Sequence, residues 1–199
     1  MSEVVVIAPH PDDETLGCGG TLLRHKEEND SIHWLIMTSM SDKSHWESSR
    51  LKQRELEIQS VANAYSFDSV HQASFESMRL DLIPKVDLVS EISSFFKVIE
   101  PDTIYLPYRA DAHSDHEAVF DATVACTKSF RFPSVAKIRA YETLSDDNKR
   151  ILYDNYKRFS FLKDYNFTDE ELQEMNKYYD MLLKNENVRL ATTLYKTLP

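Results

Sequence analysis

An imidazole followed by three acidic side chains stands near the start of the chain. The segment runs Pro9-His10-Pro11-Asp12-Asp13-Glu14. Three carboxylates this close repel one another, whereas a divalent cation would neutralise them and accept a neutral imidazole nitrogen. A polar turn with Asp12 or Asp13 capping the next helix would explain the acids, but not the histidine and the two prolines. The segment is therefore a candidate metal-binding loop.

A second group of ionisable side chains follows a later apolar run. It has the pattern H-x-D-H, formed by His113, Asp115 and His116. A capping box between Ser114 and Glu117 would explain those two residues and would start a helix at this point. It would not explain the two histidines or the aspartate between them. This segment is a second candidate for metal binding or catalysis.

The two loops together predict a metalloenzyme. Each follows a predicted strand, and in a parallel sheet such loops meet at the same edge. Two histidines and one carboxylate, with a fourth position left to water, are typical of a catalytic zinc site rather than a structural one. Three groups then remain: Asp12, His113 and Asp115. They suit a general base, an electrophilic or acid partner, and a carboxylate that orients this partner.

The elements that position these loops follow from the hydrophobic pattern. Short apolar runs alternate with longer segments of helical period, which is typical of βα units with a mainly parallel sheet. Strands are predicted at 3–8, 32–38, 70–75, 103–107 and 136–141. Helices are predicted at 15–28, 48–65, 84–100 and 114–128.

The composition changes after residue 145. Residues 1–145 are predicted to form a catalytic α/β domain, and residues 146–199 a helical extension packed on it. The extension is polar and rich in Tyr, Lys and Glu, and Thr168 with Glu171 has the spacing of a capping box. Its apolar stripe indicates packing against the main domain rather than ligand binding.

Charge and composition exclude several classes of protein. The chain has 23 Lys and Arg against 33 Asp and Glu, a formal net charge of -10, so nucleic acid is not an expected partner. Neither a signal-like start nor a long apolar run is present, which predicts a cytoplasmic protein without an integral membrane segment. Cys18 and Cys126 are too few for a disulfide framework and are expected to be reduced thiols.

All three glycines of the chain lie within residues 17–20. Glycine inside a helix is unfavourable, so this cluster predicts a close approach of the backbone to another part of the fold. With so few glycines the chain has no Walker A loop, no nucleophile elbow and no complete G-x-G-x-x-G, since Leu22 occupies the last position.

These motifs resemble those of the PIG-L/LmbE-like N-acetylglucosaminyl deacetylases, which carry an (A/P)-H-P-D-D-E loop and a later H-x-D-H. The resemblance covers about the first 145 residues. It includes Arg54 and Glu57 at the family's R-x-x-E spacing and the segment 141–145. It implies a Rossmann-like α/β sandwich and hydrolysis of an N-acetyl group from an amino sugar.

The resemblance also implies roles for single residues. It implies a divalent metal, most often zinc, held by His10, Asp13 and His116. Asp12 would be the general base toward the attacking water. His113, held by Asp115, would act as an imidazolium that stabilises the oxyanion and can protonate the leaving amine. Whether Asp12 or His113 supplies that last proton stays open.

The substrate is defined only by its class. Arg54, Arg109 and Asp111 are candidate substrate-binding residues, although an ion pair with Glu57 is an equal alternative for Arg54. The expected substrate is a small N-acetylglucosamine-type amino sugar, as a glycoside or linked to a nucleotide or lipid. Two alternatives stay open: a metal-dependent amidase or esterase for another small molecule, and a catalytically silent sugar-binding protein. The sequence also leaves a homo-oligomer open.

Overall fold

The computed structural model describes residues 1–40 and 46–143. The predicted helical extension over 146–199, with its capping box at Thr168 and Glu171, lies outside the described residues. The predicted division into residues 1–145 and 146–199 therefore stays a prediction.

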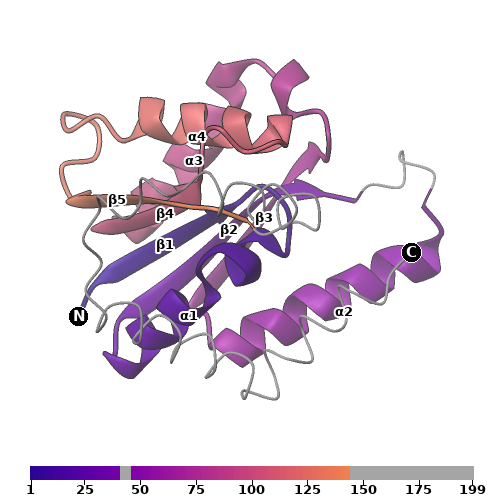
Figure 1. Cartoon of the computed structure of the whole chain (residues 1–199), viewed down its shortest axis with the longest axis horizontal. Coiled ribbons are helices and arrows are strands. Elements are labelled where there is room, and N and C mark those ends of the chain that lie inside the picture. Colours follow the sequence, from indigo (N-terminus) through magenta and orange to yellow (C-terminus); the bar gives the residue numbers. More distant parts are fainter. Residues whose placement is uncertain (41–45, 144–199) are drawn as a thin grey trace, which may run out of the picture.

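Five parallel strands form one sheet in the order β3-β2-β1-β4-β5 (Figure 1). The strand β1 lies at the centre, and Val6 in it pairs with Trp34 on one side and with Tyr105 on the other. The strands are β1 (Glu3–Ala8), β2 (Ser31–Ser39), β3 (Ser69–Glu76), β4 (Thr103–Pro107) and β5 (Lys137–Tyr141). This sheet confirms the predicted mainly parallel topology.

Helices cover both faces of the sheet (Figure 1). One face carries α1 (Asp13–Glu27) and α2 (Ser48–Tyr65), and the other carries α3 (Lys85–Ile99) and α4 (Ser114–Cys126). A short 3-10 helix, η2 (Leu80–Leu82), precedes α3. The result is the Rossmann-like sandwich that the family resemblance implies.

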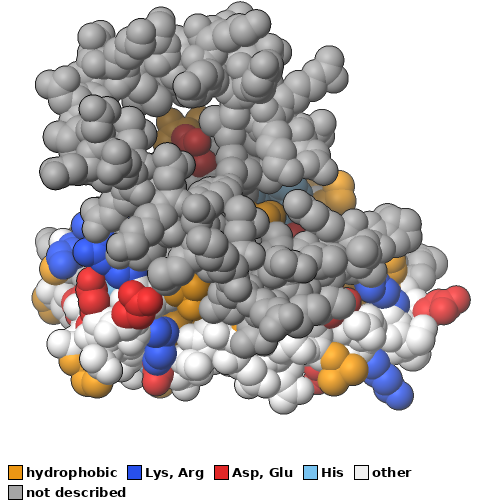
Figure 2. All heavy atoms as spheres, turned by 60° about the horizontal axis from the view of Figure 1, so that its bottom comes forward, with side chains coloured by type: hydrophobic (Ala, Val, Ile, Leu, Met, Phe, Trp, Pro, Cys, Tyr) orange, Lys and Arg blue, Asp and Glu red, His pale blue; other side chains and the backbone are white. Residues whose placement is uncertain are grey.

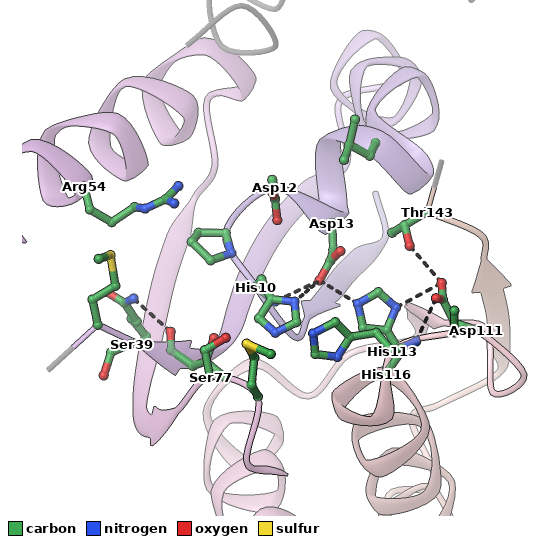
Figure 3. Close-up of a pocket in the computed structure, with 17 residues that line it drawn as sticks. His10, Asp12, Asp13, Ser39, Arg54, Ser77, Asp111, His113, His116 and Thr143 are labelled. Carbon is green, nitrogen blue, oxygen red and sulfur yellow. Dashed lines mark hydrogen bonds and ion pairs between the residues drawn. The ribbon is translucent and has the colours of Figure 1, made fainter. Parts of the chain in front are cut away.

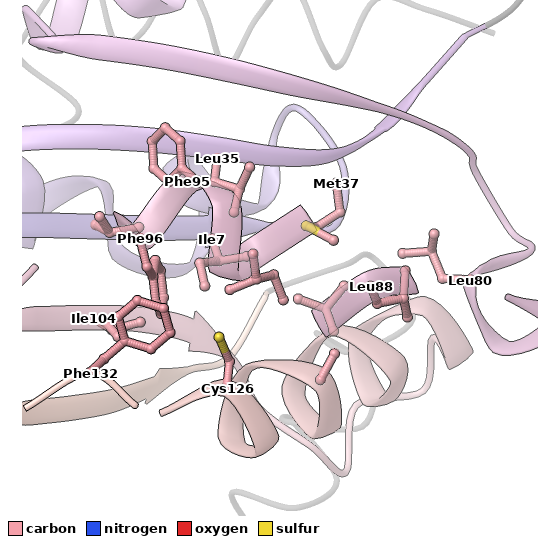
Figure 4. Packing of buried hydrophobic residues seen from close by; sticks show 14 residues of the cluster. Ile7, Leu35, Met37, Leu80, Leu88, Phe95, Phe96, Ile104, Cys126 and Phe132 are labelled. Carbon is pink, nitrogen blue, oxygen red and sulfur yellow. The ribbon is translucent and has the colours of Figure 1, made fainter. Parts of the chain in front are cut away.

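Alternation along β1 divides the core into two clusters. Side chains of a strand point to opposite faces in turn. Val4 and Val6 accordingly pack with residues of α1 and α2, whereas Val5 and Ile7 pack with residues of α3 and α4. Figure 4 shows the second cluster, in which apolar side chains fill the space between the sheet and these two helices. Both helix layers are thereby fixed against the strands that end at the candidate site.

The predicted bounds agree closely with the structure. The strands β1 and β4 and the helix α2 have the predicted limits. The helix α1 begins at Asp13, two residues earlier than predicted, so the acidic loop runs directly into its first turn. The short helix η2 is not predicted by the hydrophobic pattern.

The order of strands creates a switch point beside β1. From β1 the chain continues to β2 and β3 on one side, while β4 and β5 lie on the other. The loops after β1 and β4 are therefore neighbours at the carboxyl ends of adjacent strands. Open α/β sheets bind ligands at such a point.

Side chains of opposite sign lie together on the surface. Figure 2 shows basic side chains next to acidic ones on the visible part of the described chain. On α4, for example, Asp121 accepts hydrogen bonds from Lys85 at 2.9 Å and from Arg109 at 2.8 Å. Within the described residues, no helix combines the length and apolar character needed to cross a bilayer.

Candidate metal centre

A cavity of about 570 Å³ lies at the switch point. The loop after β1 and the first turn of α1 contribute His10, Asp12 and Asp13 to its wall, and the β4–α4 loop contributes Asp111 and His113 (Figure 3). The two groups that the sequence singles out thus meet in one cavity, as the parallel topology predicts.

Three of these side chains surround one point. Oδ2 of Asp13 lies 3.3 Å from Nδ1 of His10 and 3.3 Å from Nε2 of His116. All three potential ligand atoms lie within 4.8 Å of one another. Four ligands placed tetrahedrally around zinc at its usual bond lengths are about 3.3 Å apart. The donor set and its spacing therefore fit a divalent metal ion.

Each of the two imidazoles has a carboxylate beside its far nitrogen, as a hydrogen bond for His10 and as an ion-pair contact for His116. Nε2 of His10 lies 3.0 Å from Oδ2 of Asp115, and Nδ1 of His116 lies 3.1 Å from Oδ2 of Asp111. A carboxylate on the far nitrogen fixes the orientation and the tautomer of a metal-binding histidine. The arrangement leaves one nitrogen of each ring directed at Asp13.

The pKa values show that the centre favours positive charge. Burial opposes ionisation of Asp13, but hydrogen bonds to His10 and His116 outweigh it and lower the pKa of Asp13. Burial also opposes protonation of His10, yet hydrogen bonds to Asp115 and Asp13 raise the pKa of His10 to about 10. The pKa of His116 is raised by Asp13 in the same way, against burial. Such surroundings stabilise a cation.

Asp12 lines the same cavity but is not one of the three central groups. Burial, and then the charge of Asp13, raise its pKa to about 6, while His10 and Arg54 act in the opposite direction. A carboxyl group whose pKa is raised toward neutrality can exchange a proton near physiological pH. Its environment is therefore that of a potential base rather than of an inert surface acid.

His113 is the N-cap of α4, which corrects the predicted capping box. Its Nδ1 accepts a hydrogen bond from the backbone N–H of Asp115 at 3.1 Å. Glu117 instead lies 2.8 Å from Nη2 of Arg109. The imidazole takes the capping position that the sequence suggests for Ser114, because α4 begins at Ser114 itself.

The carboxylate of Asp115 lies within 4.8 Å of His113, but it makes its hydrogen bonds to other groups. That carboxylate contacts His10 and accepts the backbone N–H groups of Met78, at 2.7 Å, and Leu80, at 2.9 Å. Burial, and then the neighbouring charge of His10, lower the pKa of His113. With Nδ1 accepting a hydrogen bond, the proton of the neutral ring is on Nε2.

The two arginines lie in different places. Arg54 lines the cavity, and its Nη1 lies 3.6 Å from the buried Glu57, so the position in the cavity wall and the ion pair occur together. Arg109 is 53% exposed and does not line the cavity, because it forms a hydrogen bond with Asp121 and an ion pair with Glu117. The structure does not bring Arg109 to the other candidate residues.

Other residues that line the cavity could not be recognised as functional from the sequence. Thr143 donates a hydrogen bond to Asp111 at 2.8 Å. Ser39 at the end of β2, Gln72 in β3 and Met78 after β3 also border the cavity. None of them belongs to a motif of ionisable residues. Their only sequence signal is that some of them closely follow a predicted strand.

The fold is that of a Rossmann-like α/β protein. At its switch point lies a cluster of histidines and aspartate whose spacing fits a metal ion. Residues 5–127 match the family model described as PIG-L: GlcNAc-PI de-N-acetylase, and the chain belongs to this family. The matched segment includes both loops that line the cavity.

Individual relatives agree with this assignment. The chain is 28% identical over 151 residues to the uncharacterized deacetylase YaiS from Escherichia coli (strain K12), covering 71% of this chain and 74% of that protein. The structure of the conserved protein TT1542 from Thermus thermophilus is similar with a TM-score of 0.60 and 27% identity, covering 73% of this chain and 68% of that one.

A more distant structure shares the fold. The N,N'-diacetylchitobiose deacetylase from Pyrococcus horikoshii aligns with a TM-score of 0.58 at 16% identity, covering 92% of this chain and 77% of that one. At this low sequence identity the comparison shows only that the two proteins share the α/β sandwich fold.

Proposed function

We propose that this chain is a zinc-dependent hydrolase that removes the N-acetyl group from an N-acetylglucosamine-type amino sugar. The observation that carries the proposal is the cluster of His10, Asp13 and His116, with an aspartate behind each imidazole. Its donors suit a divalent cation, and two nitrogens with one carboxylate oxygen are the ligands of many catalytic zinc sites.

The family and its members support the reaction class. The matching family model is that of a de-N-acetylase of a glucosamine-containing lipid, and YaiS is described as a deacetylase. The Pyrococcus horikoshii protein acts on diacetylchitobiose, and a further structural relative is a teicoplanin deacetylase. The substrates named for these proteins are GlcNAc-PI, diacetylchitobiose and teicoplanin, and an acylamino sugar is the substrate class that we assign.

The metal would be held by His10, Asp13 and His116. When bound there, a divalent ion supplies Lewis acidity toward the amide carbonyl and lowers the pKa of water. Asp115 and Asp111 hold the two imidazoles in the orientation that binding requires.

Asp12 and His113 perform the proton and charge chemistry in this proposal. Asp12, with its pKa raised to about 6, takes the proton from the attacking water and can deliver it to the amine that leaves. His113, whose Nδ1 is occupied by the N–H of Asp115, donates a hydrogen bond from Nε2 to the oxygen that becomes negative. The sugar contacts Arg54, which also lines the cavity.

Acetate release tests the proposal. Purified protein with one equivalent of zinc is incubated with methyl N-acetyl-β-glucosaminide and with diacetylchitobiose, and acetate is measured. The variant Asp12→Asn is expected to lose about a hundredfold or more in kcat while it retains zinc, because it lacks the base. The variant His116→Ala is expected to lose both zinc and activity.

A matched control separates these effects from a general loss of charge. Asp121→Asn removes a carboxylate on the surface of α4, away from the cavity, and is expected to behave like the wild type. Equal rates for the wild type, Asp12→Asn and His116→Ala would refute the proposal, as would the absence of acetate from all acylamino sugars tested.

A further inference from the structure

Met78 has an unusual backbone conformation beside the candidate metal centre. Its φ is 63°, in the left-handed region that side chains other than glycine rarely adopt. Among the described non-glycine residues, only Asn29, Ser66 and Glu100 share a positive φ. Those three are polar and lie at the C-terminal ends of helices, where a left-handed residue commonly ends the helix. Met78 is apolar and ends no helix.

The buried carboxylate of Asp115 holds this conformation. Its Oδ2 accepts the N–H of Met78 at 2.7 Å, and its Oδ1 accepts the N–H of Leu80 at 2.9 Å. The same Oδ2 lies 3.0 Å from Nε2 of His10. The backbone of Met78 is therefore two hydrogen bonds away from a proposed metal ligand, and its position relative to His10 is fixed.

The side chain of Met78 lies at the rim of the cavity. It is 75% exposed and lines the cavity together with Met40 and Leu16. A large apolar side chain exposed to water gains free energy when a ligand covers it. Methionine is flexible and polarisable, and adapts to apolar partners of different shape. Strained backbone that is kept in place by its surroundings is concentrated at functional sites.

We propose that Met78 is a specificity-determining residue that packs against an apolar group of the substrate. The inference rests on the proposed function and narrows its substrate class to acylamino sugars that carry an apolar group of several carbons. That group belongs either to the aglycone or to the N-acyl chain. Sugar hydroxyls alone would gain little from this wall, because thioether and aliphatic groups leave them without hydrogen bonds.

The charge of the protein indicates that this part of the substrate is also uncharged. The chain has a net charge of -10, and Asp12, Asp13 and Asp111 all face the cavity. An anionic extension would be repelled unless it reached Arg54, whereas an uncharged alkyl or aryl group meets no such cost. The favoured extension is therefore apolar and neutral.

Two substrate pairs test the inference and distinguish the two positions of the apolar group. The first pair is the hexyl and methyl β-glycosides of N-acetylglucosamine. The second is methyl β-glucosaminide with an N-hexanoyl or an N-acetyl group. In at least one pair, wild type is expected to favour the hexyl or hexanoyl member about fivefold or more in kcat/KM. In Met78→Ser this preference is expected to fall to less than about twofold.

Two further variants are matched controls. Met78→Leu keeps an apolar side chain and is expected to keep the preference. Leu82→Ser removes another exposed apolar side chain, 66% exposed and outside the cavity, and is expected to change neither kcat/KM nor the preference. Zinc content is measured for each variant, so that a change in metal binding is not mistaken for a change in specificity.

The possible results distinguish a failure of the role of Met78 from a failure of the proposed deacetylase function. Turnover with no preference in either pair, or a preference that survives in Met78→Ser, would overturn the role of Met78 and leave the deacetylase proposal intact. If wild type released no acid from any of the substrates, both would fail.

Discussion

The carboxylate of Asp111 lies 3.1 Å from Nδ1 of His116, on the side of the ring opposite to Asp13. Thr143 donates a hydrogen bond to the same oxygen at 2.8 Å, and the backbone N–H of His113 donates to the other oxygen at 3.2 Å. Asp111 is thus fixed by contacts of its own. It can hold the His116 ring so that Nε2 remains directed at the proposed metal position.

Replacing Asp111 by Asn is expected to weaken metal binding about 10- to 100-fold, because a neutral amide orients His116 less firmly and does not increase its basicity. Competition with a chelator of known zinc affinity measures this effect. At saturating zinc, most of the activity should return. Asp121→Asn is the control, and an unchanged affinity in Asp111→Asn would contradict the role assigned to this contact.

Asp115 is expected to matter for stability as well as for metal binding. Its side chain is fully buried and accepts hydrogen bonds from the backbone of Met78 and Leu80 while it contacts His10. In Asp115→Asn an amide N–H₂ group must face at least one of these donors. The unfolding free energy of the metal-free protein should fall by about 1–3 kcal/mol.

Urea denaturation measures this loss, with Asp111→Asn as the comparison. Asp111→Asn is expected to reduce metal affinity with a smaller loss of stability, since its carboxylate accepts one backbone N–H instead of two. Equal stability losses in the two variants would show that Asp115 does not anchor the segment from Met78 to Leu80.

The sequence predicts the fold and the cluster of histidines and aspartate because both depend on strong local patterns. Apolar runs such as that of β1 mark buried strands, and the two loops with histidine and aspartate follow strands that must be parallel. Since β1 and β4 are neighbours, His10 and His116 come together without any detail of side-chain packing. The residue types then indicate a metal.

The histidine that each of Asp111 and Asp115 contacts is not predictable from the sequence. Asp111 and Asp115 both lie close to His113 and His116 in the chain, and sequence proximity favours pairing within that loop. In the structure Asp115 instead reaches His10, which is distant in the sequence. That contact depends on how the β4–α4 loop packs against the β1–α1 loop. The rim residue Met78 belongs to no motif, and its conformation depends on Asp115.

Gly17 provides a prediction about packing. The sequence predicts a close approach at the glycine cluster, and a methyl group added at Gly17 would overlap the ring of Tyr141. That ring cannot easily move, because it is buried and its hydroxyl donates a hydrogen bond to the carbonyl of Ile7 at 2.7 Å. Gly17→Ala is expected to lower the unfolding free energy by about 1–3 kcal/mol.

A double-mutant cycle tests whether Tyr141 causes this loss. In the background Tyr141→Leu the added methyl group has more room, and Gly17→Ala should cost less or even stabilise, because Ala is the better helix former by about 1 kcal/mol. The same cost in both backgrounds would attribute the effect to something other than the contact with Tyr141.

Asp30 provides a prediction about pH, far from the candidate metal centre. It accepts hydrogen bonds from the backbone N–H of Ser2 at 2.6 Å and from Nδ1 of His25 at 2.8 Å. Burial opposes its ionisation, but these hydrogen bonds outweigh burial and lower the pKa of Asp30. The stabilisation is therefore complete above the unfolded-state pKa of about 3.9, and is lost as the pH falls through the lower folded-state pKa.

Asp30→Asn should accordingly destabilise the protein by about 1 kcal/mol at pH 7 and by less at pH 3, because at low pH the wild-type carboxyl group is also becoming neutral. Urea denaturation at both pH values measures the difference. The exposed Asp81 offers a matched control, since Asp81→Asn is expected to change stability by less than about 0.5 kcal/mol at either pH. A penalty for Asp30→Asn that is as large at pH 3 as at pH 7 would mean that the charge of Asp30 does not contribute, and that only the shape of its side chain does.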